Sequence, residues 1–304
     1  MFRVHSAETV QAGSFILNSF FLSFINDDKN SRFGNDHTWN LGLTYGLNDR
    51  LELTAQIVPY QDDQRHSWAP PGETKVGVKW ATPLSGQRVQ TGLRGFVRLP
   101  TAKTANRPFE PYSSGKVALG AVALLSLDIP GRLPLRLNFN FGYLDNDIST
   151  FLSRERTDQL LLGVGVKLPI RAIIFYTEYT GEIFFNHDKI SFRDNSMRLT
   201  HGFKFRVPFN LVLDLGADIG FSNKRQRYPA PLHEYADWKI FMGLSYHFLT
   251  SRVWRGVPQT PRIDRKKQQR KLQELRSRRE RVDQELNEML NELEKEVEKE
   301  KNEP

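Results

Sequence analysis

The sequence predicts an all-β fold: an up-and-down antiparallel transmembrane β-barrel of about twelve strands, followed by a helical coiled-coil tail. Three observations predict it. Apolar residues alternate with small or polar ones in many segments, short and long connections follow one another in turn, and aromatic residues gather near the segment ends. A strand that crosses a bilayer needs about 9–11 tilted residues, with lipid on one side and a polar interior on the other.

The clearest segment covers residues 236–249 and reads ADWKIFMGLSYHFL. Every second residue of it is apolar, whereas most of the residues between are small or polar. Gly243, Tyr246 and Phe248 resemble the closing-strand signal of bacterial outer-membrane β-barrels, a glycine followed by two alternate aromatic residues. Phe241 departs from that signal, which usually has a polar residue there. The resemblance implies a barrel of the channel or transporter-like kind.

The same alternation recurs along the chain, in segments joined by connections of two kinds. Strands are predicted at residues 14–25, 38–47, 51–60, 74–84, 88–99, 116–127, 133–143, 159–168, 173–184, 196–207, 211–221 and 236–249. The odd-numbered strands are followed by long loops and the even-numbered ones by short turns. This regularity is typical of outer-membrane barrels, with short turns in the periplasm and long loops outside the cell. No run approaches about 18 consecutive apolar residues, so no membrane-spanning helix is predicted.

Aromatic residues near the ends of the segments are expected at the two membrane–water interfaces, because amphipathic rings favour the headgroup zone. Trp39, Trp238 and Tyr143 are predicted at the extracellular interface, and Tyr45 and Trp80 at the periplasmic one. The alternative is a soluble twelve-stranded sandwich. Such a sandwich would have to pack the apolar faces on one another and expose the glycine-rich opposite faces to water.

The face opposite the apolar one is predicted to line the lumen. Its charged residues are the cations Lys75, Lys79, Arg88, Arg94, Arg98, Lys116, Arg136, Lys167, Arg198, Lys204, Arg206 and Lys239 and the acids Glu52, Glu178, Glu182, Asp214 and Asp218. The excess of cations predicts a passive, porin-like channel for small solutes with an anion bias. A plugged lumen, in which the charges pair and only stiffen the barrel, is the alternative.

No enzyme, cofactor or metal site is predicted. The chain has no cysteine, which excludes disulfides, thiol catalysis and thiolate metal sites. The His-x-Ser-Asn-Gly element of outer-membrane phospholipases is absent, and His187 near Ser191 lies in a long loop with nothing to orient it. A barrel hydrolase is therefore only a third hypothesis. The net charge is +8, but the basic residues of the barrel alternate with apolar ones, so no nucleic-acid partner is expected.

The end of the chain has a different character. Residues 250–262 contain two prolines and are predicted to be a linker, and residues 263–304 are predicted to form a periplasmic helix. Apolar residues at coiled-coil positions are Leu272, Leu275, Val282, Leu286, Met289 and Leu293. They predict a coiled coil of about three heptads, and a solvated single helix is the alternative. A second function hypothesis follows: a structural outer-membrane anchor whose tail recruits a periplasmic partner or self-associates.

A barrel with a periplasmic extension is also loosely similar to the outer-membrane protein A family, although this chain has more strands and no globular wall-binding domain. Residues 1–13 are predicted to be a periplasmic segment and residues 14–249 the barrel. Residues 1–13 lack the apolar core of a signal peptide, so we expect that a leader was cleaved or that the start is truncated. Outer-membrane lipid and the barrel assembly machinery are the partners that the resemblance implies.

Overall fold

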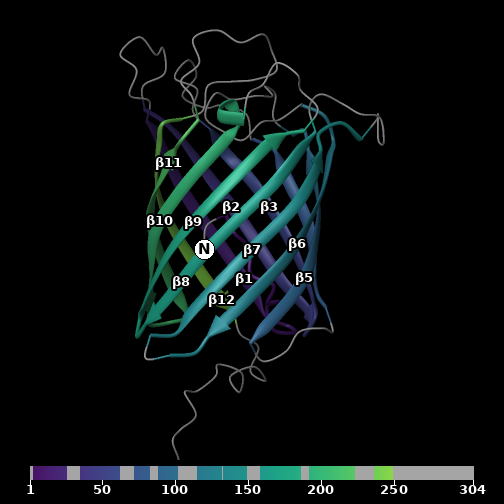
Figure 1. The fold of residues 1–304 in the computed structure, drawn as a ribbon. Coiled ribbons are helices and arrows are strands. Elements are labelled where there is room, and N and C mark those ends of the chain that lie inside the picture. The colour runs from purple at the N-terminus through teal and green to yellow at the C-terminus, as the bar shows by residue number, and fades with distance from the viewer. Residues whose placement is uncertain are drawn as a thin grey trace, which may run out of the picture. The chain divides into compact units, whose positions relative to one another are not determined.

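The computed structural model describes residues 3–25, 35–61, 72–82, 88–101, 115–131, 133–148, 158–185, 192–222 and 236–248. They form a closed barrel of twelve antiparallel strands, each paired with its neighbours in sequence, and β1 closes the barrel by pairing with β12 (Figure 1). The strands are β1 (Phe15–Ile25), β2 (Asn35–Asn48), β3 (Leu51–Gln61), β4 (Thr74–Ala81), β5 (Val89–Leu99), β6 (Ala118–Ile129), β7 (Leu135–Asp145), β8 (Gln159–Ile170), β9 (Ile173–Phe184), β10 (Ser196–Val207), β11 (Leu211–Gly220) and β12 (Trp238–Phe248). One short 3-10 helix, η2 (Phe192–Asp194), precedes β10.

The chain divides into two units, Met1–Val253 and Trp254–Pro304. The second unit, with the predicted tail helix and its six coiled-coil residues, lies outside the described residues, as does the predicted linker. Within the described part of the chain, no helix is long and apolar enough to cross a membrane.

Closure of the sheet leaves no unpaired edge. Residues of β1 from Phe15 to Ile25 pair one by one with residues of β12 from Phe248 to Trp238. A bilayer interior offers no water to satisfy backbone groups, so a sheet in it must close on itself. The predicted strands all occur, with ends that differ by a few residues. The largest consequence is at β6, which begins at Ala118 and leaves Lys116 outside the strand.

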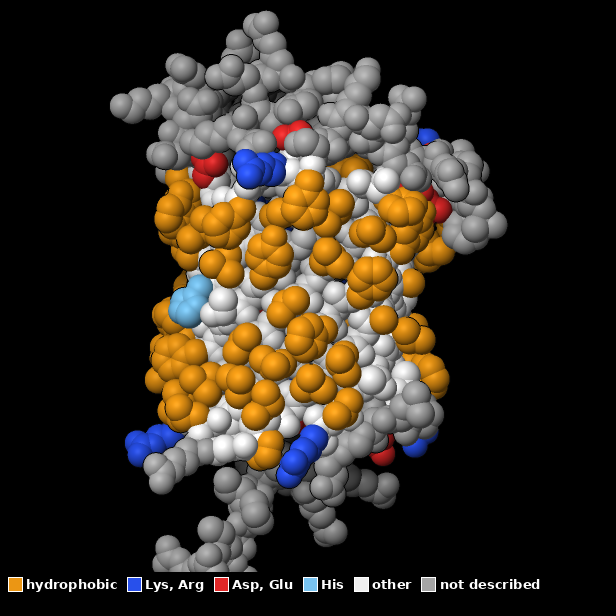
Figure 2. Space-filling view, viewed as in Figure 1, with side chains coloured by type: hydrophobic (Ala, Val, Ile, Leu, Met, Phe, Trp, Pro, Cys, Tyr) orange, Lys and Arg blue, Asp and Glu red, His pale blue; other side chains and the backbone are white. Residues whose placement is uncertain are grey.

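The outside of the barrel is apolar over most of its height. Figure 2 shows a broad belt of hydrophobic side chains, with Lys and Arg near its two ends. Single side chains in it are well exposed, such as Leu244 at 47%, Ile240 at 52% and Phe141 at 61%. So large an apolar surface is foreign to water-soluble monomers and matches a bilayer.

The five predicted interface aromatics are all on the outward face of the barrel, each with an exposed side chain: Trp39, Tyr45, Trp80, Tyr143 and Trp238. The Trp39 Nε1–H donates a hydrogen bond to Ser19 Oγ (2.8 Å), and the Tyr143 hydroxyl donates one to Asp158 Oδ2 (2.6 Å). Their depth in a membrane stays a prediction.

Inward-facing aromatic rings lie over glycines of the adjacent strand. A Cβ atom at Gly120 would come within 2.2 Å of the Phe96 ring, and one at Gly243 within 2.2 Å of the Phe20 ring. Tyr176 over Gly202 and Phe241 over Gly216 repeat the arrangement. The missing side chains give these rings room beside the wall. Gly243 of the closing-strand signal has this packing role.

Candidate functional site in the barrel lumen

The N-terminal segment lies inside the barrel (Figure 1). The sequence predicted a periplasmic segment for residues 1–13. Residues 3–13 instead run along the lumen wall, where Val4 is 3% exposed and Ala7 fully buried. We refer to residues 3–13 as the lumen segment. The prediction failed because the segment has no periodic pattern, and its partners come from strands far along the chain.

Side chains of the barrel wall form hydrogen bonds with the backbone of the lumen segment. Glu178 Oε2 accepts hydrogen bonds from the backbone N–H groups of Arg3 (2.7 Å) and Val4 (3.2 Å). The His5 N–H donates to Asn140 Oδ1 (2.7 Å), and Asn140 Nδ2 donates back to the His5 carbonyl (2.8 Å). Buried backbone groups need such partners. The wall therefore holds the segment through its main chain.

Two further contacts continue this pattern along the lumen segment. The Ala7 N–H donates to Ser126 Oγ (2.9 Å), and the Val10 N–H donates to Glu52 Oε2 (2.8 Å). The wall also leaves space for the segment, because a Cβ atom at Gly46 would lie 2.3 Å from the Gln11 carbonyl oxygen. Inward acids and inward glycines were visible in the sequence, but nothing there indicated that they face this segment.

Most charges on the wall formed by β9 to β12 are paired. Arg198 Nε donates to both oxygens of Asp218 (2.9 Å each), and Lys204 Nζ donates to Asp214 Oδ2 (2.6 Å). The Arg3 guanidinium of the lumen segment lies 3.6 Å from Asp218. Lys239, also predicted to face inward, lies with its Nζ 4.8 Å from the centroid of the Phe24 ring. This wall is an ion-pair network.

The wall formed by β4 and β5 carries four cations. Lys75 lies opposite Arg98 in the register, and Lys79 opposite Arg94. Lys79 Nζ forms an ion pair with Glu52 (3.0 Å), and Arg98 lies 4.0 Å from a carboxylate oxygen of Glu73, just before β4. We call Lys75, Lys79, Arg94 and Arg98 the cationic wall. The strand register brings these four residues together on one wall, and that they line an open pore stays a prediction.

Lys75 and Arg94 differ from the other two cations of this wall. Among the described residues neither forms an ion pair with an acid. Arg94 Nη1 contacts His5 Nε2 (2.5 Å), while Lys75 Nζ lies 4.1 Å from the centroid of the Phe96 ring. Burial, together with the positive charge of Arg94, holds the pKa of His5 well below its usual value, so the ring is neutral and accepts from Arg94. These two positive charges therefore have no direct ion pair with an acid in the described part of the chain.

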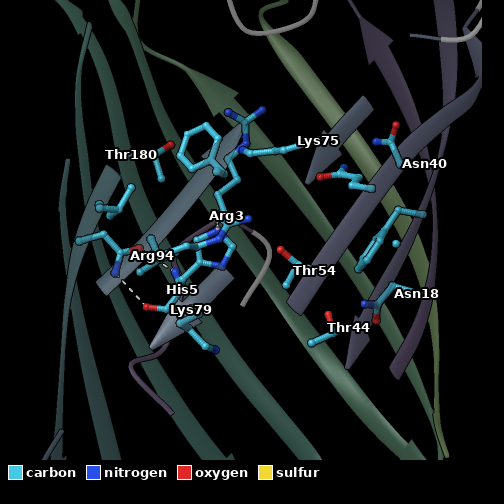
Figure 3. Close-up of a pocket in the computed structure, with 18 of the residues that line it drawn as sticks. Arg3, His5, Asn18, Asn40, Thr44, Thr54, Lys75, Lys79, Arg94 and Thr180 are labelled. Atoms are coloured by element: carbon cyan, nitrogen blue, oxygen red, sulfur yellow. Dashed lines mark hydrogen bonds between the residues drawn. The ribbon is translucent and has the colours of Figure 1, made fainter. Parts of the chain in front are cut away.

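A cavity of about 460 Å³ lies beside the cationic wall and is lined by residues of the lumen segment as well as by strands. Figure 3 shows Lys75, Lys79, Arg94 and His5 on one side of it and Asn18, Asn40 and Thr44 on the other. The uncharged polar side consists of Asn18, Asn40, Thr44, Thr54 and Gln56, and the apolar lining includes Phe20 and Phe96. We call these five polar residues the neutral wall. The alternation places Asn40, Thr44, Thr54 and Gln56 inward, but they carry no charge and were not singled out; the first strand is apolar on both faces, so its pattern does not place Asn18.

Outside the cationic wall, the predicted lumen residues that line the cavity are Glu52, Glu182 and Lys204; the others do not join this site. Lys116 is exposed and pairs with Asp147, and Arg136 pairs with Asp128 (2.5 Å) and with Glu8 of the lumen segment. Arg88 and Arg206 are exposed near strand ends, and Lys167 is half-buried on β8.

The rings of Tyr246 and Phe248, from the closing-strand signal, pack edge-to-face on the outside of the barrel, with their centroids 4.2 Å apart. No group of three or more metal-ligating side chains occurs in the described part of the chain.

No protein-family model and no curated protein sequence matches this chain. Among solved structures it is similar to an outer membrane channel from Pseudomonas putida F1, with a TM-score of 0.51 and 13% identity over 80% of this chain and 98% of that one. It is also similar to the NanC porin, with a TM-score of 0.49 and 11% identity over 76% of this chain and 98% of that one. Likeness at such identity shows the fold alone. Together with the closed twelve-stranded sheet and its apolar belt, it makes the chain an outer-membrane β-barrel protein in fold.

Proposed function

We propose that the chain is a passive channel for small solutes that favours anions. The observation that carries this proposal is the cationic wall, where Lys75 and Arg94 border a cavity of about 460 Å³ without an ion pair to any described acid. Positive charge held away from bulk water without a counter-charge is costly. An anion that enters the lumen offsets this cost, whereas a cation increases it.

The opposite charges of the barrel do not cancel this bias. Asp214 and Asp218 are each engaged by a cation of their own wall, at 2.6 Å and 2.9 Å. Their charge is therefore used locally, and the wall of β9 to β12 is close to neutral. Charged side chains that line a pore bias which ions enter it. Two acids, Glu52 and Glu182, line the cavity itself, but the cations that line it outnumber them.

The test compares two variants that lose the same charge. Lys75→Gln with Arg94→Gln should move the zero-current potential in a KCl gradient toward the potassium equilibrium potential. The control, Lys167→Gln with Arg206→Gln, removes two lumen-side cations that do not line the cavity and should shift it much less. Equal shifts in the two variants would mean that net charge, and not the cationic wall, sets the preference.

A second candidate function is the structural anchor, and the lumen segment favours it. Residues 3–13 occupy part of the lumen, with backbone hydrogen bonds of 2.7–3.2 Å to Glu178, Asn140, Ser126 and Glu52. A lumen obstructed in this way would carry no solute, and the barrel would serve to hold its tail at the membrane. Barrels that insert fully into a bilayer and pass no current would support the anchor against the channel.

A further inference from the structure

We propose that the lumen cavity is a binding site for a small organic anion that carries hydroxyl groups. Its charged end would meet Lys75 and Arg94, and its hydroxylated body would meet the neutral wall. The proposal rests on the channel function and deepens it, because it names the class of solute that the lumen recognises.

The charged end of the ligand is defined by two cations. Lys79 and Arg98 already have Glu52 and Glu73 beside them, at 3.0 Å and 4.0 Å. Arg94 has five N–H donors and gives one contact to His5, so most of its donors remain available. A carboxylate that accepts from Arg94 and lies near Lys75 would give these two cations a direct ionic partner.

The neutral wall is defined by its unused hydrogen-bonding groups. The side chains of Asn18, Asn40, Thr44 and Gln56 form no hydrogen bond with any part of the protein that the structure describes, and Thr54 Oγ1 donates only a long one of 3.3 Å to the Gly77 carbonyl. Amide and hydroxyl groups both donate and accept. Hydroxyl groups of a solute are the matching partners, because they also do both.

The size of the cavity separates an organic anion from a simple ion. Its volume of about 460 Å³ falls in the range of roughly 300–1,000 Å³ that small-molecule sites occupy. A halide at the cationic wall would leave the neutral wall untouched. Phe20 and Phe96 line the same cavity and offer apolar surface to a carbon skeleton.

The lumen segment is part of this site. Arg3, Val4 and His5 line the cavity together with residues of the strands. His5 also holds Arg94 in place through the contact of 2.5 Å. The site is therefore complete only when the segment lies in the lumen.

The experiment compares three probes by titration calorimetry on the refolded full chain in detergent. Gluconate has a carboxylate and hydroxyls, hexanoate has the carboxylate on a plain chain of six carbons, and glucose has hydroxyls without the charge. Gluconate should bind about tenfold more tightly than either of the others. Hexanoate lacks the one to three hydrogen bonds of the hydroxyl groups, and glucose lacks the ionic contact. Equal affinity for gluconate and hexanoate, equal affinity for gluconate and glucose, or no binding of gluconate would each overturn the proposal.

Variants then locate the binding. Asn40→Leu with Thr44→Val should lower gluconate affinity to that of hexanoate and leave hexanoate unchanged, while Lys167→Gln should leave both unchanged. If the first variant binds neither gluconate nor hexanoate, it is misfolded. The comparison of the three probes on the wild-type chain then tests the proposal without this variant. Gluconate binding without conductance would keep the site and remove the channel. Anion-selective conductance without a gluconate preference would keep the channel and remove the site.

Discussion

Leu244 lies near the middle of β12 on the lipid side, with 47% of its surface exposed. Leu244→Arg should lower the free energy of unfolding by about 2–4 kcal/mol, because a charge at this depth faces hydrocarbon. Reversible unfolding from lipid vesicles by denaturant measures it. Ile129→Arg is the control, since Ile129 ends β6 at 45% exposure, where arginine costs about 0–1 kcal/mol. Similar losses in the two variants would place the membrane elsewhere on the barrel.

Gly120 provides a second prediction at this scale. A Cβ atom there would meet the Phe96 ring at 2.2 Å, so Gly120→Val should drive the ring into the cavity and lower the single-channel conductance. Phe96→Ala added to the same chain should restore it, because the displaced ring is then absent. If Gly120→Val leaves the conductance unchanged, the Phe96 ring does not border the conducting path.

Individual residues show which parts of the site could be predicted from the sequence. Alternation alone placed Lys75, Lys79, Arg94 and Arg98 on one wall, because a period of two fixes the face and hairpin neighbours share it. It did not reveal their partners. Glu73 lies one residue before β4, and the register that brings Glu52 opposite Lys79 depends on strand pairing. The sequence predicts a strand that includes Lys116 because the alternation begins before Ala118, the first residue of β6.

The lumen segment is the element with the greatest effect on the site. Deletion of residues 1–10 should raise the single-channel conductance, because the hydrogen-bonded residues 3–10 then leave the lumen. The control is His5→Ala, which keeps the backbone bonds to Asn140 and should change the conductance much less. An unchanged conductance in the deletion variant would show that the segment does not restrict passage.

The position of this element was beyond prediction for a physical reason. Strands of the barrel pair with sequence neighbours, so period and turn length suffice to order them. The lumen segment has no such neighbour; Arg3 meets Glu178 across 175 positions of the chain. Contacts of this kind depend on the shape of the finished barrel. Sequence patterns therefore predicted the twelve strands and the faces, but not what fills the space between them.

The tail is the second element to test, and its coiled coil stays a prediction. A peptide of residues 263–303 should gain helicity with concentration, because burial of Leu272, Leu286 and the other seam residues needs a partner helix. Circular dichroism over a range of peptide concentrations measures it. Low helicity at every concentration would leave a solvated tail and weaken the anchor hypothesis.

At the scale of the whole barrel, two regions of the lumen wall differ in charge. Most charges on β9 to β12 are paired, such as Arg198 with Asp218 at 2.9 Å, whereas Lys75 and Arg94 on β4 and β5 form no ion pair with a described acid. The two regions face each other across the lumen, which the lumen segment enters. This asymmetry, and not the total charge of +8, is the basis of the proposed anion preference.

The preference itself is tested most directly by the zero-current potential of the wild-type barrel in a planar bilayer under a KCl gradient. The potential should lie toward the chloride equilibrium value at about 0.1 M salt. It should approach zero near 1 M, because the Debye length falls from about 10 Å to about 3 Å and the cationic wall is screened. A potential toward the potassium value, or an inserted barrel that passes no current, would contradict the channel.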